Sequence, residues 1–462
     1  MNIFSYILAG TFLYSFIKYS NNLKKLFRSL FLLASIISLT LDYGYFIMIG
    51  SYEFSYDEIC VGILFVVALF YMMEGRYNRK ILQGSLLFLL SGIIAVLFML
   101  IFPKIDIGYI PHDQSWDHYV YGRILKTYEF SISAGSFMIL FRFFLLFIII
   151  AVIKEIFTIE DWKYIYNIIL FVVKAYILYG FIELILKNLF KIDVGNTFLT
   201  PFFGLGKSTY STLSERGGLY MLQGFFRETS TFSTFLFVAA IFFCLEIRAN
   251  NLKKINYLWL ASCLFLTLLS GSFSGILYSA LILIFFVFCL KKNRRNILLF
   301  FALMFMVLLA VFLSIYGFGY ANYYLERLET TFEAINSIIS DGAKIKASEY
   351  IRLASGYNLM QLWIRYPLFG IGYGTASGHS SFWSMLASGG IVGFLIYYHI
   401  VFRLGMGNKK LKLGAVLIFF SWALTGSIGR FYSLSNLILF YVICNHDLII
   451  KYLDKTNKVL EN

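Results

Sequence analysis

Long apolar runs alternate with short polar segments along almost the whole chain. A helix needs roughly 20 apolar residues to cross a bilayer, and runs near this length recur throughout the sequence. The pattern therefore predicts an all-α polytopic membrane protein with about 13 transmembrane helices (12–14). The expected spans are 2–17, 29–41, 59–73, 81–102, 136–153, 164–186, 231–247, 256–270, 273–290, 297–318, 384–402, 413–426 and 433–450.

Composition excludes a soluble globular protein. Of the 462 residues 60% are hydrophobic and only 14% are charged, whereas soluble domains carry about 25% charged residues. We interpret residues 1–462 as a single integral membrane domain. Residues 2–17 lack a basic segment and a small-residue cleavage site, so we expect a first span there and not a signal peptide. The five cysteines lie in or beside apolar runs and predict small core residues.

The basic residues indicate the topology. More than half of the 39 Lys and Arg residues fall in one alternate set of short loops and in the C-terminal segment. By the positive-inside rule that side is cytoplasmic, including the C-terminus. The net charge of +14 is therefore a topology signal, and no nucleic-acid partner is expected. This set of loops comprises 18–28, 74–80, 154–163, 248–254, 291–295 and 403–412.

The longest loops lie on the outer side, at about 103–135, 187–230 and 319–383, and they contain all four prolines. Because long connections are usually functional, we expect the chemistry to face outward, which disfavours the use of cytoplasmic nucleotide sugars. The loop 319–383 is expected to begin with an amphipathic helix that lies on the outer membrane surface or caps the bundle. Its apolar stripe is Leu325, Leu328, Phe332, Ile335 and Ile339.

Arginines in the outer loops are candidates for binding phosphate. A guanidinium grips phosphate oxygens in bidentate fashion and stays charged at any relevant pH. A converging set would suit a lipid-linked diphosphate. The alternative is that each arginine contacts lipid headgroups or pairs with an acid such as Glu215. The candidates are Arg216, Arg227, Arg352, Arg365 and Arg430.

Two further segments carry candidate chemistry. Segment 223–233, QGFFRETSTFS, places Arg227 and Glu228 directly before a span, although its Ser and Thr residues can simply start a helix. His379 lies in a glycine-rich return to the membrane. Histidine is suited to accept a proton from a sugar hydroxyl near neutral pH. The alternative is a packed or solvated histidine.

Acidic and basic residues elsewhere leave alternatives open. Segment 111–118, PHDQSWDH, contains His112, Asp113, Asp117 and His118, and Asp57 and Glu58 begin another span. These side chains could supply metal ligands, but their spacing matches no strong metal signature, and a solvated loop is the alternative. Arg142, Lys174 and Glu183 lie inside expected spans, where they line a site or pair with one another.

The layout and two motifs resemble the Wzy-type O-antigen and capsule polymerases, with the related O-antigen ligases behind them. The first motif, before a span, is matched at Gly224, Phe226, Glu228 and Ser230, with Thr229 in place of the usual proline. The second combines an arginine, PLFGIGYG and GHSSFWSMLASGGIVGF. It is matched at Arg352, Pro367, Leu368, Gly370, Gly372, His379, Gly389, Gly390 and Gly393.

The resemblance implies a GT-C-like glycosyltransferase that needs no metal or other cofactor and acts on the outer, periplasmic or extracellular, face of the bacterial cytoplasmic (inner) membrane. It would transfer a glycan from undecaprenyl diphosphate to a hydroxyl of a lipid-linked repeat unit. Arg352 and either Arg216 or Arg227 would hold the diphosphate, and His379 would orient or deprotonate the acceptor hydroxyl, with Glu228 as the second catalytic candidate.

Partners implied by the resemblance are the undecaprenyl-diphosphate-linked oligosaccharide, the lipid bilayer and a chain-length regulator protein. Two alternatives stay open at this point. An O-antigen ligase uses the same chemistry with a different acceptor. A lipid-linked oligosaccharide flippase or other transporter belongs to a different class, and it would carry a polar or charged central cavity and shorter outer loops.

Overall fold

A computed structural model provides the fold. It describes residues 2–40, 45–50, 52–111, 129–132, 134–204, 215–216, 218–226, 228–249, 254–289, 319–339, 348–405, 413–424, 431 and 433–460. The described chain is mostly helical, as expected of an all-α membrane protein. It divides into two compact units: unit 1 comprises 1–63, 158–327 and 445–462, and unit 2 comprises 64–157 and 328–444. The single membrane domain stays a prediction.

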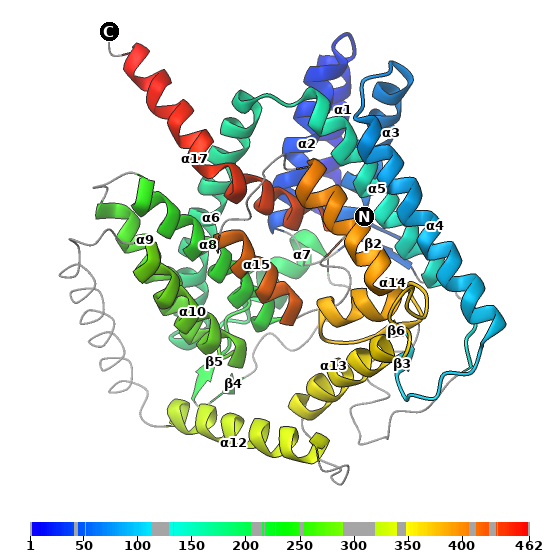
Figure 1. The fold of residues 1–462 in the computed structure, drawn as a ribbon. Helices are drawn as coiled ribbons and strands as arrows, with labels where there is room; N and C mark the ends of the chain where they lie inside the picture. The colour runs from blue at the N-terminus through cyan, green and yellow to red at the C-terminus, as the bar shows by residue number, and fades with distance from the viewer. Residues whose placement is uncertain are drawn as a thin grey trace. The chain divides into compact units, whose positions relative to one another are not determined.

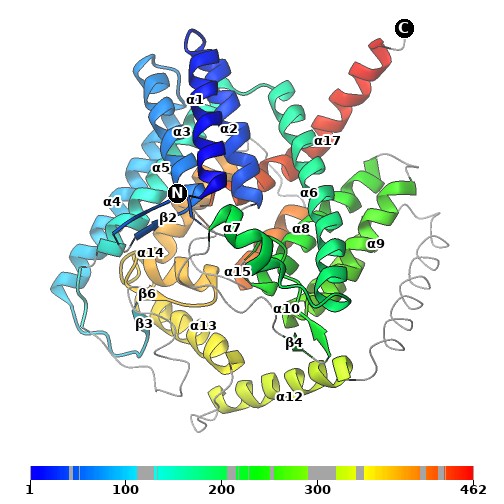
Figure 2. The same cartoon turned by 180° about the vertical axis from the view of Figure 1, so that it is seen from behind.

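Unit 1 is organised around α8, which lies beside α9 and α10 (Figure 1). Helix α8 is mostly apolar and buried along most of its length, which is typical of a core helix. Figure 2 shows α1 and α2 side by side in the same unit. Its helices are α1 (Ile3–Tyr19), α2 (Leu23–Thr40), α6 (Ile159–Asn188), η2 (Gly195–Leu199), α7 (Thr200–Phe203), α8 (Thr229–Ala249), α9 (Lys254–Leu269) and α10 (Phe273–Cys289).

Two short antiparallel hairpins complete unit 1. Strand β1 (Ile47–Ile49) pairs with β2 (Tyr52–Phe54), and β4 (Glu215–Arg216) pairs with β5 (Leu219–Tyr220). The second hairpin precedes α8 and therefore leads into the first motif.

Unit 2 contains the second motif. Strand β3 (Ile110–Pro111) pairs antiparallel with β6 (Ala376–Ser377), so the segment before His379 is tied to the start of another long loop. Helices α3 (Tyr56–Met73), α12 (Gly319–Ile339) and α17 (Leu434–Leu460) have residues in both units. The other helices of unit 2 are α4 (Arg79–Ile101), α5 (Ala134–Ile156), α13 (Ser348–Arg365), α14 (Ser381–Tyr398), η4 (His399–Gly405) and α15 (Leu413–Leu424).

Each expected span coincides with a helix except 297–318, which lies outside the described residues. Within the described chain, seven helical segments are long and apolar enough to cross a membrane. Others are shorter: α1 has 17 residues and extends about 26 Å, less than a hydrocarbon core of about 30 Å. The count of 13 spans and the GT-C fold stay predictions. The seven are Tyr56–Met73, Arg79–Ile101, Gly135–Ile156, Ile159–Asn188, Thr229–Ala249, Ser381–Phe402 and Leu434–Lys451.

The helix expected from the spacing of apolar residues in the last long loop is confirmed as α12. Its stripe is exposed: Leu325 retains 62% and Phe332 65% of its accessible surface. Glu326, Glu329 and Glu333 lie off the stripe, as the spacing predicted. Docking of this face on a membrane surface stays a prediction.

Candidate functional site

The candidate residues fall in both units. Arg216 and Glu228 belong to unit 1, whereas Arg352, Arg365 and His379 belong to unit 2. Two other candidates, Arg227 and Arg430, lie outside the described residues. The site is therefore described as two loops, one before α8 and one before α14.

In unit 1, a buried ion pair at the end of α6 holds the loop before α8. The Lys187 ammonium lies 2.6 Å from the Glu183 carboxylate, and both side chains are at most 2% exposed. Each then bonds the loop backbone: Glu183 accepts from the amides of Gln223 at 3.1 Å and Gly224 at 2.8 Å, and Lys187 donates to the Met221 carbonyl at 3.1 Å. The in-span Glu183 thus pairs with its own helix neighbour, which leaves neither charge without a partner.

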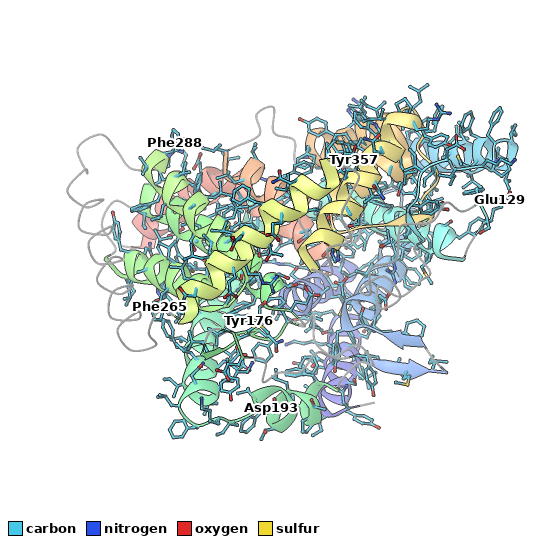
Figure 3. The ribbon with its side chains drawn as sticks, turned by 90° about the horizontal axis from the view of Figure 1, so that it is seen from below. Glu129, Tyr176, Asp193, Phe265, Phe288 and Tyr357 are labelled. Atoms are coloured by element: carbon cyan, nitrogen blue, oxygen red, sulfur yellow. The ribbon has the colours of Figure 1, made fainter. Side chains whose placement is uncertain are left out.

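The same face of α6 binds the aromatic part of the motif. Tyr176, labelled in Figure 3, packs against Phe225 and Phe226 with ring centroids 5.1 and 5.8 Å apart. Tyr179 stacks on Phe225 at 4.3 Å. Gly224 adopts a left-handed φ of +60°, and a Cβ there would lie 2.9 Å from the Phe232 ring. The motif glycine is therefore required for a tight turn against α8.

Glu228 lies at the start of α8. Its carbonyl accepts from the amides of Thr231 and Phe232, and its half-buried carboxylate accepts from the Ser230 hydroxyl at 2.8 Å. A carboxylate is favoured at a helix N-terminus by the helix dipole. Segment 223–233 thus starts a helix, which was the alternative interpretation of its sequence. The catalytic role of Glu228 stays a prediction. Arg216 lies on β4, paired with Leu219 across the hairpin.

In unit 2, the segment carrying His379 is fixed against α13. The His379 amide donates to the Ser355 hydroxyl at 3.3 Å, and Ser355 lies three residues, about one helical turn, after Arg352. The preceding Gly378 packs so closely on Leu359 that a Cβ would lie 2.2 Å from its side chain. The loop backbone at His379 is therefore bonded to α13 about one helical turn from Arg352, which lies on that helix.

The glycines of the second motif interlock two backbone segments. Helix α14 is broken at Gly390, which has φ +61°. The amides of Ile371 and Gly372 donate to the carbonyls of residues 387 and 388, and the amides of residues 391 and 392 donate to the carbonyls of Pro367 and Leu368. A membrane protein tolerates irregular backbone where other protein groups form hydrogen bonds with its N–H and C=O groups. Here the PLFGIGYG segment forms these bonds with α14 on both sides of Gly390.

Arg365 lies in the last turn of α13, near Asp106. The guanidinium and carboxylate are 3.6 Å apart and both side chains are mostly exposed, so the pair contributes little to stability. The neighbouring Tyr366 hydroxyl donates to the Lys104 carbonyl at 3.2 Å. Partial burial, with a smaller effect of Asp106, raises the pKa of Tyr366, which keeps this donor protonated.

The residues of the metal alternative are only partly described. His112, Asp113, Asp117 and His118 lie outside the described residues. Glu58 forms a capping box with Ser55 at the start of α3, its carboxylate accepting from the Ser55 amide at 3.0 Å. Among the described residues, no three or more His, Cys, Asp and Glu side chains group as metal ligands would.

A buried polar cluster in unit 1 was not predicted. The hydroxyl of Tyr166 on α6 donates to the Glu246 carboxylate on α8, and His446 Nε2 on α17 lies 3.3 Å from the same oxygen. All three are almost fully buried. The signal available in the sequence was an acid and a histidine inside apolar runs. Lys174, also in a span, lies over the Trp259 ring at 5.9 Å.

These observations define the class of the protein: a membrane-embedded, all-α protein with two motif-bearing loops held by different means. No protein-family model matches the sequence, and no curated protein matches it either.

Proposed function

We propose that the protein is a polymerase of surface polysaccharide, an O-antigen or a capsule. It transfers a glycan from undecaprenyl diphosphate to a hydroxyl of a lipid-linked repeat unit on the outer face of the bacterial cytoplasmic membrane. The proposal rests on the resemblance, and one observation carries it furthest: the His379 amide is bonded to α13 one turn from Arg352.

The roles follow from the chemistry of the side chains. Arg352 binds diphosphate oxygens and stabilises the negative charge that develops as the diphosphate leaves. His379 takes the proton of the acceptor hydroxyl as the new glycosidic bond forms. The sequence offers Arg216, Arg227, Arg365 and Arg430 as further candidates for binding phosphate, and Glu228 as the second catalytic candidate.

The first test is the surface glycan ladder and the lipid-linked intermediates of cells that lack this gene. A single capped repeat unit in place of the ladder supports the polymerase. Long polymer left on its lipid carrier, without capping, would instead identify an O-antigen ligase. The outcome separates two enzymes with the same bond-forming chemistry.

The second test concerns the two residues. Arg352→Ala and His379→Ala in complemented cells should each abolish polymer while the amount of protein in the membrane is unchanged. Arg352→Lys should also polymerise poorly, because an ammonium cannot make the bidentate grip. Wild-type chain lengths with His379→Ala would exclude the proton-transfer role, and full activity with Arg352→Lys would reduce Arg352 to a general positive charge.

A transporter of lipid-linked oligosaccharide is the second candidate. It is favoured by the buried cluster of Tyr166, Glu246 and His446, since ionisable groups inside membrane helices often mark transport or proton pathways. Repeat units trapped on the cytoplasmic face in cells lacking the gene would support it. Glu246→Gln should then reproduce the trapping, whereas under the polymerase proposal it should leave the ladder intact if the protein folds.

A further inference from the structure

A single face of α6 contacts the first motif loop from β5 to Phe226. Tyr176, Tyr179, Glu183 and Lys187 are spaced by three and four residues, so they align along one side of the helix. Each of them contacts the loop: the tyrosines bind its phenylalanines, and the charged pair binds its backbone. Next along the helix, Asn188 accepts from the Tyr220 amide at 2.9 Å.

Burying the Glu183–Lys187 ion pair at this position carries a desolvation penalty. Removing two charges from water carries a penalty of several kcal/mol per ion, and replacing such a pair by apolar residues is often neutral or stabilising. Here the pair also satisfies three backbone groups of a loop that has little regular structure of its own. Apolar residues could fill the same volume but could not bond those groups. The pair therefore determines the conformation of the loop rather than adding to stability alone.

We propose that Glu183 and Lys187 are positioning residues, which fix the loop 219–226 so that Glu228, two residues further on, is presented in one place. The proposal rests on the polymerase function proposed above. Neither residue contacts the reacting atoms: each acts through the backbone of Met221, Gln223 and Gly224. A catalytic group displaced by about 1 Å can lose about 100-fold in rate, so a loosened loop is expected to lower turnover.

The test uses the full-length protein in nanodiscs and the double variant Glu183→Gln/Lys187→Met. This variant removes both charges together, so that no unpaired ion is buried. Methionine cannot donate to the Met221 carbonyl, and the glutamine amide has one acceptor oxygen in place of the two that receive the Gln223 and Gly224 amides. The matched control is Arg28→Met/Asp161→Asn, which removes a second ion pair of α6. That pair joins α2 to the opposite end of the helix, with Nε and Oδ1 2.8 Å apart and Asp161 3% exposed.

Two measurements are made on both variants. Hydrogen exchange should become faster in peptides covering 219–226 in the Glu183/Lys187 variant and stay unchanged there in the control. Polymerisation of lipid-linked repeat units, extracted from cells that lack the gene, should show kcat reduced about tenfold to 100-fold with KM nearly unchanged, the signature of a lost transition-state contact. The control should turn over like the wild type.

The outcomes separate this proposal from the proposed function. Unchanged exchange in 219–226 would overturn the positioning role, and so would faster exchange with wild-type turnover. Equal losses of turnover in the control would overturn it as well, because any ion pair on α6 would then suffice. A wild-type protein that forms no polymer would overturn the polymerase function, while the exchange measurement would still decide whether the pair holds the loop.

Discussion

The two motif loops are fastened to their units in contrasting ways. Before α8, side chains of α6 do most of the holding, with the Glu183–Lys187 pair bonded to three backbone groups. Before α14, main-chain hydrogen bonds hold the loop. Segments 367–372 and 387–392 cross there and form four such bonds, and the glycines at this backbone crossing leave no room for a Cβ.

The difference teaches how each region responds to substitution. A loop held by side chains can be loosened stepwise, because each contact can be altered alone. A crossing of two backbones is intolerant of any added atom, because the neighbours that must move are themselves main chain. We expect charge-balanced changes in the first loop to lower function while the protein still folds, and any added atom at the crossing to destabilise the fold.

The largest effect is expected from breaking the ion pair on one side only. Lys187→Met leaves the Glu183 carboxylate buried without its cation, which costs about 3–5 kcal/mol of unfolding free energy. The double variant Glu183→Gln/Lys187→Met should recover most of that loss, because no charge stays buried. Thermal unfolding of the purified proteins in detergent measures both. A single variant as stable as the double would contradict this account of the pair.

Alanine at the backbone crossing should be next in effect. In Gly390→Ala the new Cβ would lie 2.1 Å from the Leu368 carbonyl, and in Gly370→Ala 2.3 Å from that of Ala387, both at a left-handed φ. Overpacking costs about 1–3 kcal/mol, and the left-handed conformation about 1–2 kcal/mol more.

The control for these two variants is Gly356→Ala on α13, where the nearest atom is 3.9 Å away. Alanine favours a helix interior by about 1 kcal/mol over glycine, so the melting temperature should hold or rise. If Gly390→Ala and Gly370→Ala had the same melting temperature as the control, the two backbone segments at the crossing would be able to move apart at little cost in free energy.

The sequence predicts what depends on local spacing. The apolar runs located the described helices that coincide with the expected spans, and the three-and-four spacing of Leu325, Leu328 and Phe332 located α12, whereas α13 was not predicted. The partner of Glu183 could also have been predicted from the sequence, because Lys187 lies four residues further on, which is the spacing of ion pairs within a helix. Ending the span at 186 placed Lys187 in a loop and concealed the pair.

Contacts between distant segments could not be predicted in this way. The bond from His379 to Ser355 requires knowing that the return to the membrane packs on α13. The break at Gly390 requires the backbone of Pro367 and Leu368 to replace helical partners. Such pairings depend on which helices are neighbours, and hydrophobic periodicity specifies only the face that a helix buries.

The smallest effect on stability, and the sharpest probe of the second loop, is Ser355→Ala. It removes the hydroxyl that accepts from the His379 amide, which costs about 1 kcal/mol. Ser384→Ala on α14 is the matched control, because the buried Ser384 hydroxyl has no hydrogen-bond partner in the described structure. If this bond sets the position of His379, Ser355→Ala should lower polymer turnover several-fold more than its stability loss explains, and Ser384→Ala should not. Equal turnover in the two variants would mean that packing of Gly378 on Leu359 is sufficient to hold the histidine.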